Sequence, residues 1–477
     1  PWLMELPDPI SKVTWDNYIT MNPADVAALG LNEMKRQDKI ASIAELTVNG
    51  TTIKIPVYPQ PGQTAGTIGL AIGYGRTAES LKVAFNNETN TSVGVNAYPF
   101  VTVADDTLTS ASLSVSVKAT SETYELAATQ IHHTIMGREE YLLREVSLNE
   151  YKSKEKEIWN PSAMLPMHGG GKKHVDEIDL WDAHPRLNHK WGLTIDMTSC
   201  IGCAACVVAC TVENNVHVVG KEEVGKTREM HWLRIDRYYT SDMTAAKASE
   251  EHVGAMQMYL DMENPSLNPK VTFQPMMCQH CNHAPCETVC PVLATSHSTE
   301  GLNMMTYNRC IGTRYCANNC PFKVRRFNWF NYNENPDFTN VNPAQQDLGR
   351  MVLNPDVVVR SRGVMEKCSM CQQRLQAGKL VAKAAKMPIV DGSIKTACQQ
   401  ACPTNAIMFG DLNDEASAIN TWRNDDKNYL LLEEVGVKPT VSYLLKVRNQ
   451  EEAIHHHEGH SAAPAHKEEG HKEEHHS

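Results

Sequence analysis

The chain has 477 residues, more than one hydrophobic core normally serves, so we expect two or three domains. Its 56 acidic and 45 basic side chains give a net charge of −11, a balance that argues against a general nucleic-acid binder. Hydrophobic residues make up 42% of the chain, which excludes global disorder, and no segment has the length and apolar character of a transmembrane helix.

Residues 1–120 are predicted to form a β-rich domain. Residues 43–58 hold two runs of strand-forming residues separated by Asn49-Gly50, the signature of a tight β-hairpin. Apolar residues alternate with polar ones further along, as in a half-buried strand, at Leu113, Val115 and Val117. The chain opens on Pro1 without a methionine, and we expect it to continue a longer polypeptide whose export signal lies upstream.

Three further regions follow in chain order. Residues 121–190 are charged and mixed in character, and we interpret them as a connecting segment. Residues 191–450 hold every cysteine, and strands are predicted at 193–196, just before the first cysteine, and at 232–239. Residues 451–477 contain eight histidines and seven glutamates, which favours a disordered tail over a metal-binding one.

The 15 cysteines carry the most specific pattern in the sequence. Their odd number and their confinement to one stretch argue against a disulfide framework. They form four groups, which are Cys200, Cys203, Cys206 and Cys210; Cys278, Cys281, Cys286 and Cys290; Cys310, Cys316 and Cys320; and Cys368, Cys371, Cys398 and Cys402. The first group has the C-x2-C-x2-C-x3-C spacing of bacterial ferredoxins, in which three close thiolates hold one cluster and the fourth holds its neighbour. We therefore predict an α+β multidomain protein with two ferredoxin-like iron–sulfur modules. The spacing leaves open which groups are partners.

The third group is one cysteine short. Thr313 stands where the repeat calls for a cysteine between Cys310 and Cys316. Three thiolates can hold a [3Fe–4S] cluster, so the cysteine count fits three [4Fe–4S] clusters and one [3Fe–4S] cluster. A [4Fe–4S] cluster with another kind of ligand is the rival interpretation, although a threonine hydroxyl is a poor substitute for a thiolate.

Two other uses of cysteine fit the pattern less well. C-x2-C pairs also hold structural zinc, but zinc sites take four ligands in two pairs rather than triads, so a zinc-stabilised scaffold is a weaker alternative. Covalent haem needs a C-x2-C-H sequence, which this chain lacks, so we expect no haem on it.

The cysteine block, from about 190 to 412, resembles the four-cluster electron-transfer subunits of the molybdopterin oxidoreductases. The resemblance rests on four stretches, which are 200–206, 278–281, 310–316 and 401–407. Residues 1–120, beginning Pro1-Trp2-Leu3-Met4-Glu5-Leu6-Pro7-Asp8-Pro9, resemble the C-terminal β-barrel domain of the catalytic subunit of those enzymes. The fusion of these two parts in this order resembles the large iron–sulfur subunit of bacterial alternative complex III.

The resemblance implies how the cysteine groups pair: the first group shares its clusters with the fourth, and the second shares its clusters with the third. The implied ligand sets are Cys200, Cys203, Cys206 and Cys402 for one [4Fe–4S] cluster; Cys368, Cys371, Cys398 and Cys210 for a second; Cys278, Cys281, Cys286 and Cys320 for a third; and Cys310, Cys316 and Cys290 for the [3Fe–4S] cluster, with Thr313 at the missing corner. No side chain is expected to be catalytic, because the clusters only relay electrons.

The resemblance also implies a place in a respiratory chain. The expected function is electron transfer from quinol oxidation to c-type cytochromes, on the periplasmic face of the inner membrane and without molybdenum in this chain. The expected partners are an integral-membrane quinol-binding subunit, multihaem and monohaem cytochromes, and an upstream molybdopterin-like half of the same polypeptide. The electron-transfer part of a true molybdoenzyme, such as a polysulfide-type reductase, is the alternative.

A basic run follows the third cysteine group, at Lys323, Arg325 and Arg326. One interpretation is docking to the membrane subunit, or a positive charge that raises the potential of a nearby cluster. The other is an ordinary solvated turn, and the sequence does not separate the two.

Overall fold

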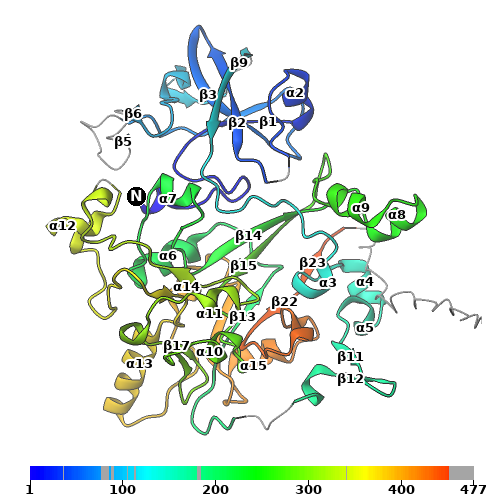
Figure 1. Cartoon of the computed structure of the whole chain (residues 1–477), viewed down its shortest axis with the longest axis vertical. Coiled ribbons are helices and arrows are strands. Elements are labelled where there is room, and N and C mark those ends of the chain that lie inside the picture. Colours follow the sequence, from blue (N-terminus) through cyan, green and yellow to red (C-terminus); the bar gives the residue numbers. More distant parts are fainter. Residues whose placement is uncertain are drawn as a thin grey trace, which may run out of the picture.

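The computed structural model describes residues 1–35, 37–76, 85–86, 91–104, 106–111, 114–179, 184–339 and 341–450. Figure 1 shows two parts, an N-terminal sheet in blue and a larger body, to which residues 200–402 with all the cysteines belong. The predicted tail, 451–477, lies outside the described residues. No helix in the described ranges is long and apolar enough to cross a bilayer.

The N-terminal part is built on a five-stranded mixed sheet in the order β4-β1-β3-β2-β9. Its strands are β1 (Ile19–Met21), β2 (Ile40–Val48), β3 (Thr51–Pro59), β4 (Ile68–Leu70) and β9 (Val115–Glu125). The predicted hairpin is confirmed, because β2 and β3 pair antiparallel across Asn49 and Gly50, whose φ angles of 49° and 81° are those a tight turn requires. The predicted strand at Val115 and Val117 is confirmed as part of β9, which pairs with β2, whereas Leu113 lies outside the described residues.

The expected barrel is not confirmed. Within the described residues, β4 pairs only with β1 and β9 only with β2, so the sheet ends in two edges. Helix α2 (Pro23–Ala28) begins at Asn22, whose side chain caps it, and covers a core that includes the fully buried Ile19 and Ile55. Shorter elements complete this part, which are β5 (Phe85–Asn86), β6 (Thr91–Ser92), β7 (Thr102–Ala104) and β8 (Thr107–Thr109).

The segment between the two parts packs onto the cysteine-containing body. Its elements are α3 (Glu139–Leu142), β10 (Glu145–Ser147), α4 (Leu148–Ser153), α5 (Lys156–Trp159), β11 (Met164–Pro166) and β12 (Lys172–His174). Strand β10 pairs in parallel with β23 (Lys446–Arg448), near the end of the described chain. Val146 and Trp159 are buried in the same core as the residues around the cysteines. This segment is therefore structurally part of the body.

The body contains a four-stranded sheet in the order β20-β13-β22-β21 and a two-stranded ladder, β14–β15. These strands are β13 (Trp191–Asp196), β14 (Arg234–Tyr239), β15 (Val271–Met276), β20 (Ile407–Asp411), β21 (Asn428–Tyr429) and β22 (Val441–Leu444). Both predicted strands, at 193–196 and 232–239, are confirmed by β13 and β14. Smaller ladders pair β16 (Thr295–His297) with β17 (Asn303–Met305), and β18 (Arg326–Phe327) with β19 (Met365–Glu366).

Short helices surround these strands. They are α1 (Trp2–Glu5), α6 (Ala205–Glu213), α7 (Lys221–Gly225), α8 (Ala245–Glu250), α9 (Ala255–Met262), α10 (Pro285–Thr288), α11 (Tyr315–Asn318), α12 (Asp347–Arg350), α13 (Gln372–Ala385), α14 (Ala397–Ala401) and α15 (Ala418–Arg423). Helix α1 is N-terminal in sequence but packs on the body, where the buried carboxyl group of Glu5 accepts hydrogen bonds from the backbone of Val219 and Gly220.

Candidate metal centres

The structure brings the cysteines together as four sets, with none in a disulfide. They are site A (Cys200, Cys203, Cys206, Cys402), site B (Cys210, Cys368, Cys371, Cys398), site C (Cys278, Cys281, Cys286, Cys320) and site D (Cys290, Cys310, Cys316). These sets coincide with the nested groups expected from the resemblance. That their sulfurs ligate iron stays a prediction.

Two pairs of short helices explain how each site receives a ligand from a distant group. Helix α6 carries Cys206 and Cys210, four residues apart on one face, so their sulfurs reach sites A and B. Helix α14 carries Cys398 and is followed directly by Cys402, and these two cysteines reach sites B and A in the reverse order. Helices α6 and α14 pack against each other, as do α10 and α11 next to sites C and D.

The four sites are neighbours in the order A, B, C, D. Cys398 of site B acts electrostatically on Cys206 of site A, and Cys278 of site C does so on Cys368 of site B. Arg325 interacts with cysteines of both site C and site D. Cys203 of site A is exposed, whereas Cys310 of site D is half-buried, as is Cys368 of site B. Site A is therefore the most accessible of the four.

The chemistry of the donors fits iron–sulfur clusters. Burial, followed by repulsion from neighbouring sulfurs, raises the pKa values of Cys206 and Cys210 well above the usual thiol range. Ligation to a metal ion removes the thiol proton in spite of this raised pKa, since a coordinating thiol is deprotonated outright. Backbone N–H groups point at other sulfurs, including Ala294 N to Cys290 Sγ at 3.2 Å and Ala406 N to Cys402 Sγ at 3.3 Å. Hydrogen bonds of this kind set cluster potentials.

The spacing of the sulfurs suits a cluster better than a single ion. Four sulfurs around one zinc would lie about 3.8 Å apart, given a Zn–S bond of about 2.3 Å. Across the described residues, which include all 15 cysteines, no three cysteine sulfurs lie mutually within 4.8 Å. Among the described residues, the group of possible metal ligands whose atoms do lie within 4.8 Å of one another consists of His174, Asp176 and Glu433. Lys438 lies 3.5 Å from the Asp176 carboxylate in this group.

Thr313 occupies the position in site D that Cys203 occupies in site A. Both loops pass through a left-handed glycine, Gly202 and Gly312, each with φ of 73°. Each then reaches a second left-handed residue that begins a helix, Ala204 before α6 and Arg314 before α11. The cavity at site D is lined by Thr313 together with the three cysteines of that site. The local backbone is therefore the same, and only the ligand differs.

The basic run after Cys320 separates into three different environments. Lys323 is exposed and donates to the backbone oxygen of Asn318. Arg326 pairs with Glu229 at 2.7 Å. Arg325 is only 7% exposed and donates to Cys286 Sγ at 3.1 Å, so of the three it is the residue that reaches a cysteine sulfur.

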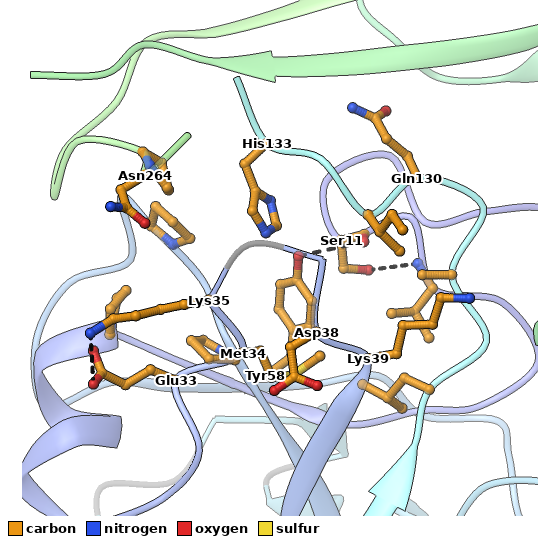
Figure 2. A pocket seen from close by; sticks show the side chains of 18 of the residues that line it. Ser11, Glu33, Met34, Lys35, Asp38, Lys39, Tyr58, Gln130, His133 and Asn264 are labelled. Atoms are coloured by element: carbon orange, nitrogen blue, oxygen red, sulfur yellow. Dashed lines mark hydrogen bonds and ion pairs between the residues drawn. The ribbon is translucent and has the colours of Figure 1, made fainter. Parts of the chain in front are cut away.

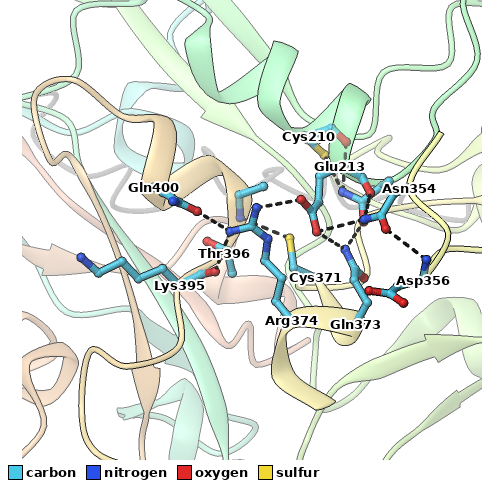
Figure 3. Close-up of polar contacts among 12 residues, drawn as sticks. Cys210, Glu213, Asn354, Asp356, Cys371, Gln373, Arg374, Lys395, Thr396 and Gln400 are labelled. Carbon is cyan, nitrogen blue, oxygen red and sulfur yellow. Dashed lines mark hydrogen bonds and ion pairs between the residues drawn. The ribbon is translucent and has the colours of Figure 1, made fainter. Parts of the chain in front are cut away.

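A second charged pair, beside site B, was missed by sequence reasoning. Glu213 ends α6 three residues after Cys210, and Arg374 lies in α13 three residues after Cys371. Their ion pair spans 2.7 Å and joins the two segments that supply site B. Figure 3 shows Arg374 between Glu213 and Gln400, close to Cys371. The sequence signal that could have predicted this pair is a charged residue three positions after a cysteine in each segment, of opposite sign in the two segments.

A cavity of about 240 Å³ lies apart from the cysteines, between the N-terminal sheet and the body. Figure 2 shows its lining, which includes Tyr58 and Met34 from one side and His133 and Asn264 from the other. Burial, followed by the charge of Arg237, lowers the pKa of His133 to about 3, so its imidazole is neutral at physiological pH. The cavity has no cysteine among its lining residues.

Paired short helices with four neighbouring cysteine sites define a ferredoxin-type iron–sulfur protein. Two stretches, 199–294 and 269–335, each match the description of a 4Fe-4S dicluster domain. The chain is 34% identical over 259 residues to the iron–sulfur cluster-binding subunit of menaquinone reductase from Nitratidesulfovibrio vulgaris, covering 54% of this chain and 88% of that protein.

Two further relatives have the same kind of name. A protein from Halobacterium salinarum, named as an iron–sulfur subunit of dimethyl sulfoxide reductase, is 31% identical over 53% of this chain and 78% of its own length. An iron–sulfur subunit of an Hdr-like menaquinol oxidoreductase from Archaeoglobus fulgidus is 28% identical over 54% of this chain and 84% of its own length. The chain belongs to the family of iron–sulfur cluster-binding subunits of these oxidoreductases.

Proposed function

We propose that this chain is the electron-transfer subunit of a membrane-bound quinol oxidoreductase in a respiratory chain. The carrying observation is that sites A, B, C and D are neighbours in that order, with Cys203 of site A exposed. A relay needs redox sites close to one another, whereas a structural metal site needs no neighbour. Electrons enter at one outer site and leave at the other.

Sites A, B and C each take a [4Fe–4S] cluster, and site D takes a [3Fe–4S] cluster. When bound, these clusters each carry one electron at a time at potentials that the surrounding protein sets. The cysteines hold the clusters, and the backbone N–H groups of residues such as Ala294 and Ala406 stabilise negative charge on the sulfurs. Thr313 leaves one corner of site D without a thiolate.

The quinol link is supported by the names of two relatives, one a menaquinone reductase and the other a menaquinol oxidoreductase. The order of a β-rich part followed by the iron–sulfur part resembles alternative complex III. On that basis the partners are an integral-membrane quinol-binding subunit, multihaem and monohaem c-type cytochromes, and an upstream molybdopterin-like half of the same polypeptide. The complex lies on the periplasmic face of the membrane.

A second candidate is the electron-transfer part of a true molybdoenzyme. The relative named as a dimethyl sulfoxide reductase subunit favours it. Molybdenum analysis of the intact complex separates the two candidates, because only the second requires stoichiometric molybdenum.

Metal and sulfide analysis of the anaerobically purified chain tests the proposal itself. We expect about 15 iron atoms per chain and a matching content of acid-labile sulfide. A chain that holds zinc in place of iron, or that is colourless, contradicts the proposal and restores the scaffold interpretation. Addition of a reduced menaquinol analogue to the intact complex then tests the quinol link, and clusters that stay oxidised would count against it.

A further inference from the structure

Arg325 is a buried cation whose partners include cluster-site sulfurs. Its Nη2 donates to Cys286 Sγ at 3.1 Å and to Asn303 Oδ1 at 3.2 Å, and its Nη1 donates to Thr295 Oγ1 at 3.1 Å. Burial raises the pKa of Cys316 in site D, and the charge of the same guanidinium opposes that rise. One side chain thus bonds to a sulfur of site C, and its charge acts on a sulfur of site D.

None of these partners is a carboxylate. A buried charge is stable only when it is paired with an opposite charge or strongly hydrogen-bonded. The ionisable groups that most strongly favour the charged form of Arg325 are all cysteines, namely Cys286, Cys316, Cys278 and Cys320. Its natural counter-charge is therefore the negative charge that thiolate ligation places at sites C and D.

The cations nearest to site B, among the residues that the structure describes, are placed differently. Arg374 is about one third exposed and already paired with Glu213, so solvent and the carboxylate both weaken its field. Lys367 is buried between sites B and C, but its Nζ donates to the backbone oxygens of Asn303 and Cys368 and not to a sulfur. Arg325, by contrast, donates directly to a ligand sulfur of site C.

We propose that Arg325 raises the reduction potentials of the clusters at sites C and D together, because one guanidinium stabilises the added electron at either site. This inference rests on the proposed function, in that it requires clusters at both sites. The charge also offsets the repulsion between electrons held at neighbouring sites. Its consequence is a relay whose electrons favour sites C and D over sites A and B.

The test is a redox titration of the full chain, followed by electron paramagnetic resonance, with Arg325→Gln compared with the parent. We expect the equilibrium constant for reduction to fall at least tenfold at both sites, which is about 59 mV for a one-electron couple. The potential of site A should not move, because the cysteines on which the charge of Arg325 acts most strongly belong to sites C and D. Lys323→Gln is the matched control, since it removes the same charge two residues away in solvent.

Two further variants keep the test decisive if Arg325→Gln assembles poorly. Arg325→Lys retains the charge and should preserve more of both potentials than Arg325→Gln does. Asn303→Asp leaves Arg325 in place but sets a carboxylate beside it, so both potentials should fall. The inference is overturned if sites C and D do not move, if only one of them moves, or if all four sites move equally. A parent chain without iron would instead overturn the proposed function.

Discussion

The buried ion pair between Arg360 and Glu366 provides a direct test of how the cysteine-containing body is held together. Both side chains are almost completely buried, and Arg360 Nη2 lies 2.8 Å from Glu366 Oε2. Arg360 also donates to the backbone oxygens of Asn214 and Asn215, which follow α6 directly. The pair therefore ties the helix that carries Cys206 and Cys210 to the strand β19.

The perturbation is Arg360→Met, which keeps an apolar stem of similar length and removes the charge. The Glu366 carboxylate then stays buried with only the hydrogen bonds from Asn328 and Trp232. Breaking a buried pair in this way costs about 3–5 kcal/mol. Arg374→Met is the matched control, because its partner Glu213 is partly exposed, and it should cost less than about 1 kcal/mol.

The loss of unfolding free energy in Arg360→Met should also depend on pH, and the direction of that dependence follows from the surroundings of Glu366. Burial raises the pKa of Glu366, but the charge of Arg360 and the neighbouring His217 outweigh it, so the pKa is lowered overall. A lowered carboxyl pKa contributes stability above the unfolded pKa of about 4.3, and this stability is lost as pH falls through the folded pKa. In Arg360→Met the pKa of Glu366 rises, so the cost of the substitution is largest at neutral pH and shrinks in acid.

Urea unfolding under anaerobic conditions, followed by circular dichroism at pH 7 and pH 5, measures both effects. The double variant Arg360→Met with Glu366→Leu should recover most of the loss, because no charge is then left unpaired. A cost below about 1 kcal/mol at pH 7, or one that is the same at both pH values, would refute the reasoning.

Three further outcomes are expected. Thr313→Cys should add one iron per chain and remove the electron paramagnetic resonance signal of the three-iron cluster. Thr404→Cys, beside site A with its four cysteines, should change neither. An unaltered spectrum in Thr313→Cys would show that Thr313 does not occupy the missing-ligand corner. Gly202→Ala should cost iron at site A, because its φ is 73° and the new Cβ would lie 2.4 Å from the ring of Phe273, whereas Gly225→Ala meets nothing and should retain full iron content. Burial raises the pKa of Glu5 to about 8, so the parent should lose melting temperature as pH rises from 5 to 8, and an equal slope in Glu5→Gln would count against this.

Local features were predictable from sequence because short-range geometry encodes them. Asn49 and Gly50 adopt the left-handed angles that a tight hairpin needs, and residues 193–196 form the strand that enters the first cysteine loop. The spacing of Cys206 and Cys210 places two sulfurs on one face of α6, whatever the rest of the chain does. The cysteine groups, and the absence of a cysteine at 313, were likewise fixed by the order of residues alone.

Tertiary packing decided what local spacing leaves open. Cys402 joins site A only because α14 packs on α6, and a contact between segments so far apart in sequence has no local signature. Packing also buried Arg325 against sulfur while leaving Lys323 in solvent, although both belong to one basic run. It set the edges of the N-terminal sheet, where a barrel was expected, and attached residues 139–174 to the body. The order of residues determines which ligands exist, and the burial of distant surfaces determines which of them meet.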